Sequence, residues 1–239
     1  MKIDFCVPAY NEDAIFPANS LRIWKFLQGL SLNHDWRLVF IVNGSSPTFQ
    51  KLVQNFTEQN RPQAVCFIVK KDGKGRAIKT YFNVSNADIL VYMDIDLAVD
   101  LEDLPRLLAP ILADEADLSF GSRMLPNSVK CRSWFRESSS RIYLYISQAL
   151  LHHHFSDLQC GFKAIKAETW RSLSAEIEDN AWFFDTELIY RAQKKGWRLR
   201  EIAVNWSENR YSRRRSKIKV WREAWIFLRA IIHLRQTVR

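Results

Sequence analysis

The sequence has few of the features that mark secreted, fibrous or membrane-spanning proteins. It has only four cysteines, none of them in a Cys-x-x-Cys pair, which favours reduced thiols over disulfides or a zinc site. Seven glycines and seven prolines in 239 residues are too few for a fibrous or disordered chain. No apolar run approaches the roughly 20 residues of a membrane-spanning helix, and the first residues read as a strand rather than as a signal peptide. We therefore expect an ordinary globular protein, with a core drawn from the 47% of hydrophobic residues.

The positive charge is concentrated near the C-terminal end. Of the net charge of +9, residues 206–239 carry +8, with ten lysines and arginines against two glutamates, whereas residues 1–205 are nearly neutral. We therefore expect one domain over residues 1–205, followed by a basic segment and an amphipathic helix over residues 206–239. Such a segment suits an anionic surface. No nucleic-acid-binding fold is recognisable, so we expect no nucleic-acid partner.

Apolar strands and helical segments alternate along the first half of the chain. The expected strands cover residues 3–7, 36–42, 65–69 and 89–93, and the expected helices run over about 12–30, up to about 59, and over about 76–84. Repeated strand–helix units predict an α/β fold with a mostly parallel central sheet and helices on both faces. Ligands of such sheets usually bind beyond the carboxyl ends of the strands. The loops after the strands are therefore the candidate site.

Two of these loops have residue types that suit a nucleoside diphosphate. Asp94 and Asp96 directly follow an apolar strand, where two carboxylates can share Mg²⁺ or Mn²⁺ and link it to a diphosphate. Lys74 lies between two glycines before an expected helix, where backbone N–H groups and an ammonium can bind a phosphate. Taken alone, an acidic pair is more often a solvated loop, and a Gly-Lys-Gly segment is often only a flexible turn.

Seven short motifs occur together and in order. They are Val7–Glu12, Asn43–Ser45, Gly73–Ala77, Met93–Leu97, Gly121–Arg123, Gln159–Lys163 and Phe184–Leu188. This series resembles the family 2 inverting glycosyltransferases of GT-A fold, and within them the dolichyl-phosphate or polyprenyl-phosphate hexosyltransferases. The resemblance covers roughly residues 3–218. It implies a metal-dependent transfer of a hexose from a GDP-mannose or UDP-glucose type of donor to a polyprenyl phosphate.

The resemblance also assigns residues to the donor and to the cation. Those expected to bind the nucleotide sugar are Pro8, Tyr10, Glu12, Ile41, Asn43, Lys74, Asp94, Ile95 and Asp96. Asp94 and Asp96 are the expected ligands of Mg²⁺ or Mn²⁺. The sequence departs from the family pattern at Val42-Asn43, where aspartates are usual, and at Ala98, where relatives often carry a polar side chain near the metal. Base preference and metal affinity are the properties that these departures affect.

The acceptor side rests on basic residues and on one aspartate. The resemblance assigns the acceptor phosphate to Arg123, Arg136, Arg213 and Lys217. Asp185, together with Asp96 and Arg123, is expected in the catalytic centre. A hydroxyl acceptor needs a carboxylate to take its proton, whereas a lipid phosphate is already an anion, and Asp185 would then orient the site. Asp157 could equally serve, and Asp185 could instead be the N-cap of a helix.

The C-terminal helix suggests where the protein works. Trp221, Trp225, Leu228 and Ile232 share one face of a helix expected over residues 220–234, with arginines opposite. This pattern fits a helix lying on a membrane surface or one docked on the domain. We expect a peripheral protein on the cytoplasmic face of a membrane, with a membrane partner subunit as a further candidate. Two alternatives remain: a transferase with a hydroxyl acceptor, and a non-catalytic module that binds nucleotide sugar or anionic lipid.

Overall fold

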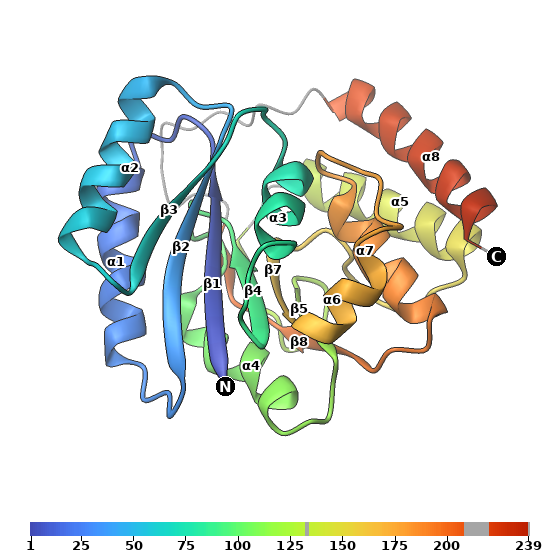
Figure 1. Ribbon diagram of the computed structural model, residues 1–239. Helices are drawn as coiled ribbons and strands as arrows, with labels where there is room; N and C mark the ends of the chain where they lie inside the picture. The colour runs from blue at the N-terminus through green and yellow to red at the C-terminus, as the bar shows by residue number, and fades with distance from the viewer. Residues whose placement is uncertain (132–133, 208–219, 239) are drawn as a thin grey trace.

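A seven-stranded sheet forms the centre of the molecule (Figure 1). The computed structural model describes residues 1–131, 134–207 and 220–238. The strands are β1 (Lys2–Ala9), β2 (Asp35–Asn43), β3 (Ala64–Val69), β4 (Ile89–Met93), β5 (Leu118–Ser122), β7 (Phe162–Lys166) and β8 (Leu199–Ala203), in the order β3-β2-β1-β4-β7-β5-β8. Strand β7 is antiparallel to both neighbours, and all other neighbours in this sheet are parallel. The predicted, mostly parallel sheet is therefore confirmed.

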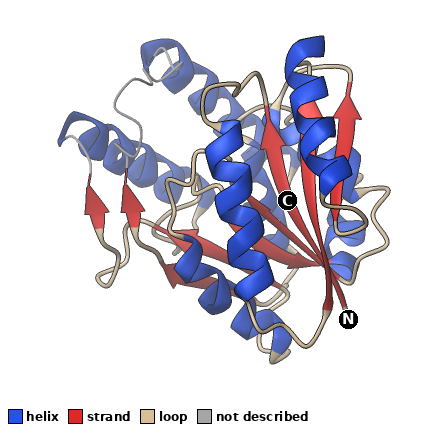
Figure 2. Ribbon diagram, turned by 90° about the vertical axis from the view of Figure 1, so that its left-hand side faces the viewer, coloured by secondary structure: helices blue, strands red, loops and turns tan. Residues whose placement is uncertain are grey.

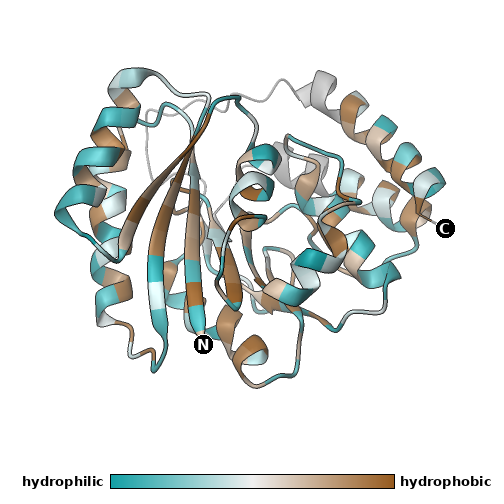
Figure 3. Ribbon diagram, viewed as in Figure 1, coloured by the Kyte–Doolittle hydropathy of each residue, from teal (hydrophilic) through white to brown (hydrophobic). Residues whose placement is uncertain are grey.

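Helices cover both faces of the sheet. They are α1 (Phe16–Gly29), α2 (Pro47–Gln59), α3 (Lys74–Phe82), α4 (Leu104–Leu112), α5 (Trp134–Leu151), α6 (Ala167–Leu173), α7 (Phe184–Lys194) and α8 (Val220–Thr237), with a short 3₁₀ turn, η1 (Leu101–Asp103). Because successive side chains of a strand point to opposite faces, Phe5 joins the core beneath α1, α2 and α4, while Cys6 joins the core beneath α3, α6 and α7. The central strands are accordingly hydrophobic along most of their length (Figure 3).

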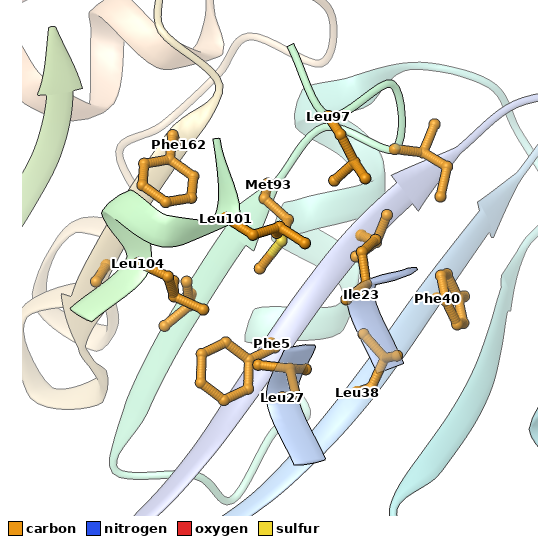
Figure 4. Packing of buried hydrophobic residues seen from close by; sticks show 14 of the residues in the cluster. Phe5, Ile23, Leu27, Leu38, Phe40, Met93, Leu97, Leu101, Leu104 and Phe162 are labelled. Carbon is orange, nitrogen blue, oxygen red and sulfur yellow. The ribbon is translucent and has the colours of Figure 1, made fainter. Parts of the chain in front are cut away.

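The first of these cores holds the amino half of the sheet against its helices (Figure 4). Phe5, Leu38 and Phe40 of the sheet pack in one cluster with Ile23 and Leu27 of α1, and all five side chains are fully buried. Burying such side chains contributes about 1.5–3 kcal/mol each. The strands whose loops form the candidate site are therefore held in a rigid frame.

Two element boundaries differ from the sequence prediction. We expected β1 to stop before Pro8, but it continues to Ala9, with Pro8 paired to Ile41 of β2. The pairing of β1 with β4 ends at Cys6, so Pro8 needs no N–H on that side. Helix α1 begins at Phe16 rather than near Glu12, because a left-handed residue and a turn come first and Pro17 occupies the first turn.

The C-terminal helix α8 packs along α5 (Figure 1). Ile231 and Leu234 of α8 share a small core with Leu151 of α5 and with Phe183 and Tyr190 around α7. A separate two-stranded sheet pairs β6 (Lys130–Cys131) with β9 (Trp206–Ser207) (Figure 2). None of the described helices is long and apolar enough to cross a bilayer. The boundary at residue 205 remains a prediction.

Candidate active site

The loops that follow β1, β2 and β4 are joined at one edge of the sheet, as expected. The backbone N–H of Asn11 donates to Ser45 Oγ at 3.3 Å, and Asn11 Oδ1 accepts from the N–H of Ser46 at 2.8 Å. Asn11 has a φ of 49°, which an asparagine tolerates better than most residues. From α1, Asn19 Nδ2 donates to the carbonyl of Ile95 at 2.7 Å. These bonds fix the loops relative to one another.

Asn43 links two of these loops from inside. Its side chain is buried, with Nδ2 placed to donate to the carbonyl of Ala9 at 3.0 Å and Oδ1 to accept from the N–H of Gly73 at 3.0 Å. An aspartate could not donate to that carbonyl, which gives a structural reason for the amide at this position. Ile41 is fully buried in the core beneath α3. Base recognition by Asn43 and Ile41 remains a prediction.

A tight turn after β4 presents the acidic pair. The N–H of Leu97 donates to the carbonyl of Asp94 at 3.2 Å, and Leu97 has a φ of 51° although it is not a glycine. Its buried side chain in the core compensates for this strained backbone. Asp96 Oδ1 accepts from the N–H of Ala98 at 3.1 Å. The main chain of Ala98 thus supports Asp96 where its side chain cannot.

Asp94 and Asp96 both line a small cavity. Other residues around it are Ala98, Arg123, Gln159, Gly161 and Trp206. Burial raises the pKa of Asp94, against the lowering effect of Lys74, while the side chain remains 38% exposed. Two carboxylates, one of them open to the cavity, fit Mg²⁺ or Mn²⁺, which prefer oxygen ligands. Within the described part of the chain no third acidic, histidine or cysteine side chain completes a metal site, so a diphosphate and water would supply the remaining ligands.

Lys74 lies between the acidic pair and a deeper carboxylate. Its Nζ is 2.9 Å from Asp94 Oδ1 and 3.3 Å from Asp185 Oδ2, and its side chain is only 7% exposed. The ammonium also lies 5.7 Å from the ring centre of Tyr92 and 5.5 Å from that of Trp182. Burial alone would lower the pKa of Lys74, but Asp185 and Asp94 outweigh it and raise that pKa. Lys74 is therefore a permanent cation inside the site.

Asp185 is buried and bound by three groups. Its Oδ1 accepts from the hydroxyl of Tyr92 at 2.5 Å and from Lys163 Nζ at 2.6 Å, and Lys74 reaches its Oδ2. Burial acts to raise the pKa of Asp185, but Lys163 and Lys74 more than offset it and hold the pKa below its usual value. The alternative that Asp185 is a helix N-cap is wrong, because Phe183 occupies that position and Asp185 lies in the first turn of α7.

Arg123 and Asp157 form a second buried ion pair beside the cavity. Arg123 Nε and Nη2 donate to the two Asp157 oxygens at 2.6 and 2.9 Å. The backbone N–H groups of Arg123 and Gln159 donate to the same carboxylate. Burial acts to raise the pKa of Asp157, but Arg123 outweighs it, and the pKa is lowered. On the other side, the guanidinium lies 5.8 Å from the ring centre of Trp206, so its orientation is fixed.

Comparison with known sequences places this site in a family. Residues 4–173 match the sequence profile described as Glycosyl transferase family 2. The chain belongs to that family. The resemblance drawn from the seven motifs is thereby confirmed.

Two curated proteins of the family illustrate the similarity. The chain is 40% identical over 207 residues to "Glycosyltransferase AglD" of Haloferax volcanii, a match that covers 86% of this chain and 33% of that protein. It is 31% identical over 213 residues to the dolichyl-phosphate beta-glucosyltransferase of Dictyostelium discoideum, covering 84% of this chain and 65% of that protein. The chain thus spans about a third of the first protein and just under two thirds of the second.

A solved structure shows the same fold. Glucosyl-3-phosphoglycerate synthase from Mycobacterium tuberculosis, in complex with Mn²⁺, UDP-glucose and phosphoglyceric acid, superposes with a TM-score of 0.68. The identity is 17%, and the match covers 100% of this chain and 80% of that one. This likeness confirms the predicted GT-A fold.

The remaining residues assigned through family 2 have different positions. Tyr10 is exposed at the end of β1, Pro8 is half-buried, and the carbonyl of Glu12 accepts from the N–H of Phe16 at the start of α1. Ile95 is buried against the core. The donor-binding roles of these residues stay predictions.

Three residues assigned to the acceptor phosphate cannot be placed. Arg136 belongs to a stretch of α5 whose side chains are not described. Arg213 and Lys217 lie outside the described residues. Of that group, the structure therefore places only Arg123 at the cavity.

Sequence reasoning missed several residues of the charged cluster. Lys163 and Tyr92 hold Asp185, and Trp182 packs over Lys74. A lysine inside the otherwise apolar strand β7 was an available signal, because a buried charge needs a partner. Its partner Asp185 lies 22 residues further along the chain. No local pattern could have named it.

Proposed function

We propose that this family 2 protein is an inverting glycosyltransferase that moves a hexose, with glucose as the first candidate, from a nucleotide diphosphate sugar to a polyprenyl phosphate. The name of the Dictyostelium relative, a dolichyl-phosphate beta-glucosyltransferase at 31% identity, supports both the acceptor class and the sugar. Asp94 and Asp96 would hold Mg²⁺ or Mn²⁺. Such a cation neutralises negative charge on the departing diphosphate.

One observation carries the choice of a phosphate acceptor. The two carboxylates considered as bases, Asp157 and Asp185, are both buried and both paired with cations. The lowered pKa of each makes it a weak base, poorly suited to take a proton from a hydroxyl. A phosphate monoester needs no such step, because it is already ionised. The site therefore suits a phosphate nucleophile better than an alcohol.

Arg123 is the side chain best placed to receive that phosphate. Asp157 engages its Nε and Nη2 and leaves Nη1 without a hydrogen-bond partner among the described residues. The guanidinium lines the cavity together with Asp94 and Asp96. An arginine with a fixed orientation binds a phosphate oxygen at little entropic cost. The attacking oxygen would thus lie near the donor diphosphate without being repelled by the acidic pair alone.

The C-terminal helix is the proposed contact with the membrane. Trp225 is 57% exposed, and the guanidinium of Arg229 lies 5.0 Å from its ring centre. Ile226 and Ile232 are also exposed on α8. Exposed tryptophan and arginine are typical of helices that lie at a lipid headgroup layer. We propose a peripheral location on the cytoplasmic face of a membrane, with a membrane partner subunit as a further candidate.

The test is sugar transfer to a short polyprenyl phosphate. The purified protein is incubated with that acceptor and a panel of UDP- and GDP-sugars, with Mn²⁺, Mg²⁺ or EDTA. We expect transfer from one donor in the presence of metal and none in EDTA. Donor hydrolysis without transfer would reject the lipid acceptor. Nucleotide binding without turnover in any combination would favour the non-catalytic alternative.

A further inference from the structure

The ammonium of Lys74 already occupies one oxygen of the expected metal ligand Asp94. The pair is tightly enclosed: a Cβ built on Gly161 would lie 2.1 Å from Asp94 Oδ2 and 2.5 Å from Lys74 Nζ. No side chain larger than that of glycine fits at this point. The backbone of Gly161 therefore presses the carboxylate and the ammonium together at 2.9 Å, from the side opposite to Asp185.

We propose that Lys74 is a positioning residue that acts as a resident counter-cation of Asp94 and keeps the bare metal ion weakly bound. Because Nζ takes Oδ1, a divalent cation meets Asp94 through Oδ2 alone. Full binding then waits for a nucleotide diphosphate, whose oxygens supply the missing ligands. This inference rests on the proposed function, since it takes Asp94 as a metal ligand.

The local charges support this assignment. The carboxylates of Asp94, Asp96 and Asp185 face the ammonium groups of Lys74 and Lys163, which gives the group a net charge of −1. Lys163 is fully buried and held by Asp185 Oδ1 and the carbonyl of Cys160, so it is committed to the interior. Lys74 is the cation of the two that contacts Asp94. Removing its charge doubles the net negative charge and frees Asp94 Oδ1.

The expected effect has the opposite sign to that of structural damage. A variant without the ammonium should bind a bare divalent cation more tightly, whereas a distorted loop would bind it less tightly. Lys79 supplies a matched control on the same helix. Its Nζ donates to the carbonyls of Ile177 and Glu178, and it makes no contact with Asp94.

The experiment is a Mn²⁺ titration without nucleotide, with free Mn²⁺ followed by electron paramagnetic resonance. Wild type, Lys74→Met and Lys79→Met are compared at neutral pH, after circular dichroism has shown that each is folded. We expect Lys74→Met to bind Mn²⁺ about fivefold more tightly and Lys79→Met to match wild type. Lys74→Gln, which keeps a hydrogen-bond donor, should shift in the same direction and replaces Lys74→Met if that variant does not fold.

The outcomes separate this inference from the proposed function. Equal or weaker Mn²⁺ binding by the Lys74 variants, with wild-type binding present, overturns the role of Lys74 alone. If wild type binds no Mn²⁺ even with millimolar UDP or GDP, Asp94 is not a metal ligand and both proposals fail. A gain from added UDP or GDP that is smaller in Lys74→Met than in wild type would support the inference further.

Discussion

Two pairs of aspartates near the cavity have different surroundings. Asp94 and Asp96 line the cavity, and Asp94 stays partly exposed with a raised pKa that reflects its burial first. Asp157 and Asp185 are at least 95% buried, and each accepts from a cationic side chain that lowers its pKa. The first pair can accept a cation from outside, while the second already holds cations of the protein. The same side chain thus serves two purposes, according to what surrounds it.

The largest effect should follow from changing the open pair. Asp94→Asn removes a charged oxygen ligand, so we expect transfer to fall by about 10³-fold, together with loss of Mn²⁺ binding. The matched control is Asp88→Asn at the amino end of β4, where the carboxylate accepts from the N–H of Lys2 far from the cavity. Steady-state transfer rates and Mn²⁺ titrations check both variants. An Asp94→Asn enzyme with near-normal transfer would remove the distinction between the pairs.

Changing Asp157 should affect the acceptor rather than the metal. Asp157→Asn loses the paired contact that orients Arg123, and we expect kcat/KM for the polyprenyl phosphate to fall about 10²-fold, mainly through KM. If Asp157 were instead a base, kcat would fall and its pH profile would lose the ascending limb. Asp117→Asn is the control, since Asp117 pairs with Arg198 in the same manner at the opposite end of β5 and β8. That control should leave KM unchanged.

Asp185 should matter more for stability than for chemistry. Asp185→Asn leaves Lys163 and Lys74 without their shared counter-charge, and we expect the free energy of unfolding to fall by about 3 kcal/mol. Transfer per folded molecule should fall less than about tenfold, because a phosphate acceptor needs no base. Urea unfolding and transfer assays on the same preparations separate the two effects. Abolished transfer by a fully folded variant would make Asp185 the base and favour a hydroxyl acceptor.

The sequence predicts the open pair far better than the buried one. Strand β4 has the predicted bounds, because a continuous apolar run ends at a charged turn and both signals are local. Asp94 and Asp96 could therefore be placed at the carboxyl edge. Strand β7 lies antiparallel between β4 and β5, an order that no local pattern reveals.

The partners of the buried aspartates depend on that distant pairing. Lys163 reaches Asp185 only because β7 inserts beside β4, which carries Tyr92. Arg123 meets Asp157 across 34 residues of sequence. The resemblance could assign these aspartates to the site, but their roles depend on partners that only the fold brings together.

The smallest effect is a difference in the pH dependence of stability. A lowered pKa means that Asp157 contributes stability above the ordinary aspartate pKa of about 3.9 and loses it as the pH falls through the folded value. Asp94, whose pKa is raised, has the opposite sign: its ionised form is unfavourable at neutral pH and this penalty disappears on acidification. The deficit of Asp157→Asn should therefore shrink from pH 6 to pH 3.

The same measurement on the open pair completes that test. In EDTA, Asp94→Asn should be more stable than wild type at pH 6, and the gain should vanish towards pH 3. Urea unfolding of wild type and both variants at each pH provides the data. Parallel pH dependences for the two variants would contradict the assigned difference between the aspartates.

The most direct test of the account compares two acceptors that differ only in the phosphate. Parallel reactions contain the wild-type protein, Mn²⁺, the donor that binds, and either a polyprenyl phosphate or the corresponding polyprenol. The account predicts metal-dependent transfer to the phosphate and none to the alcohol, because Asp157 and Asp185 are already paired with cations. Transfer to the alcohol, with the phosphate inert, would contradict it and require one of these carboxylates to act as a base.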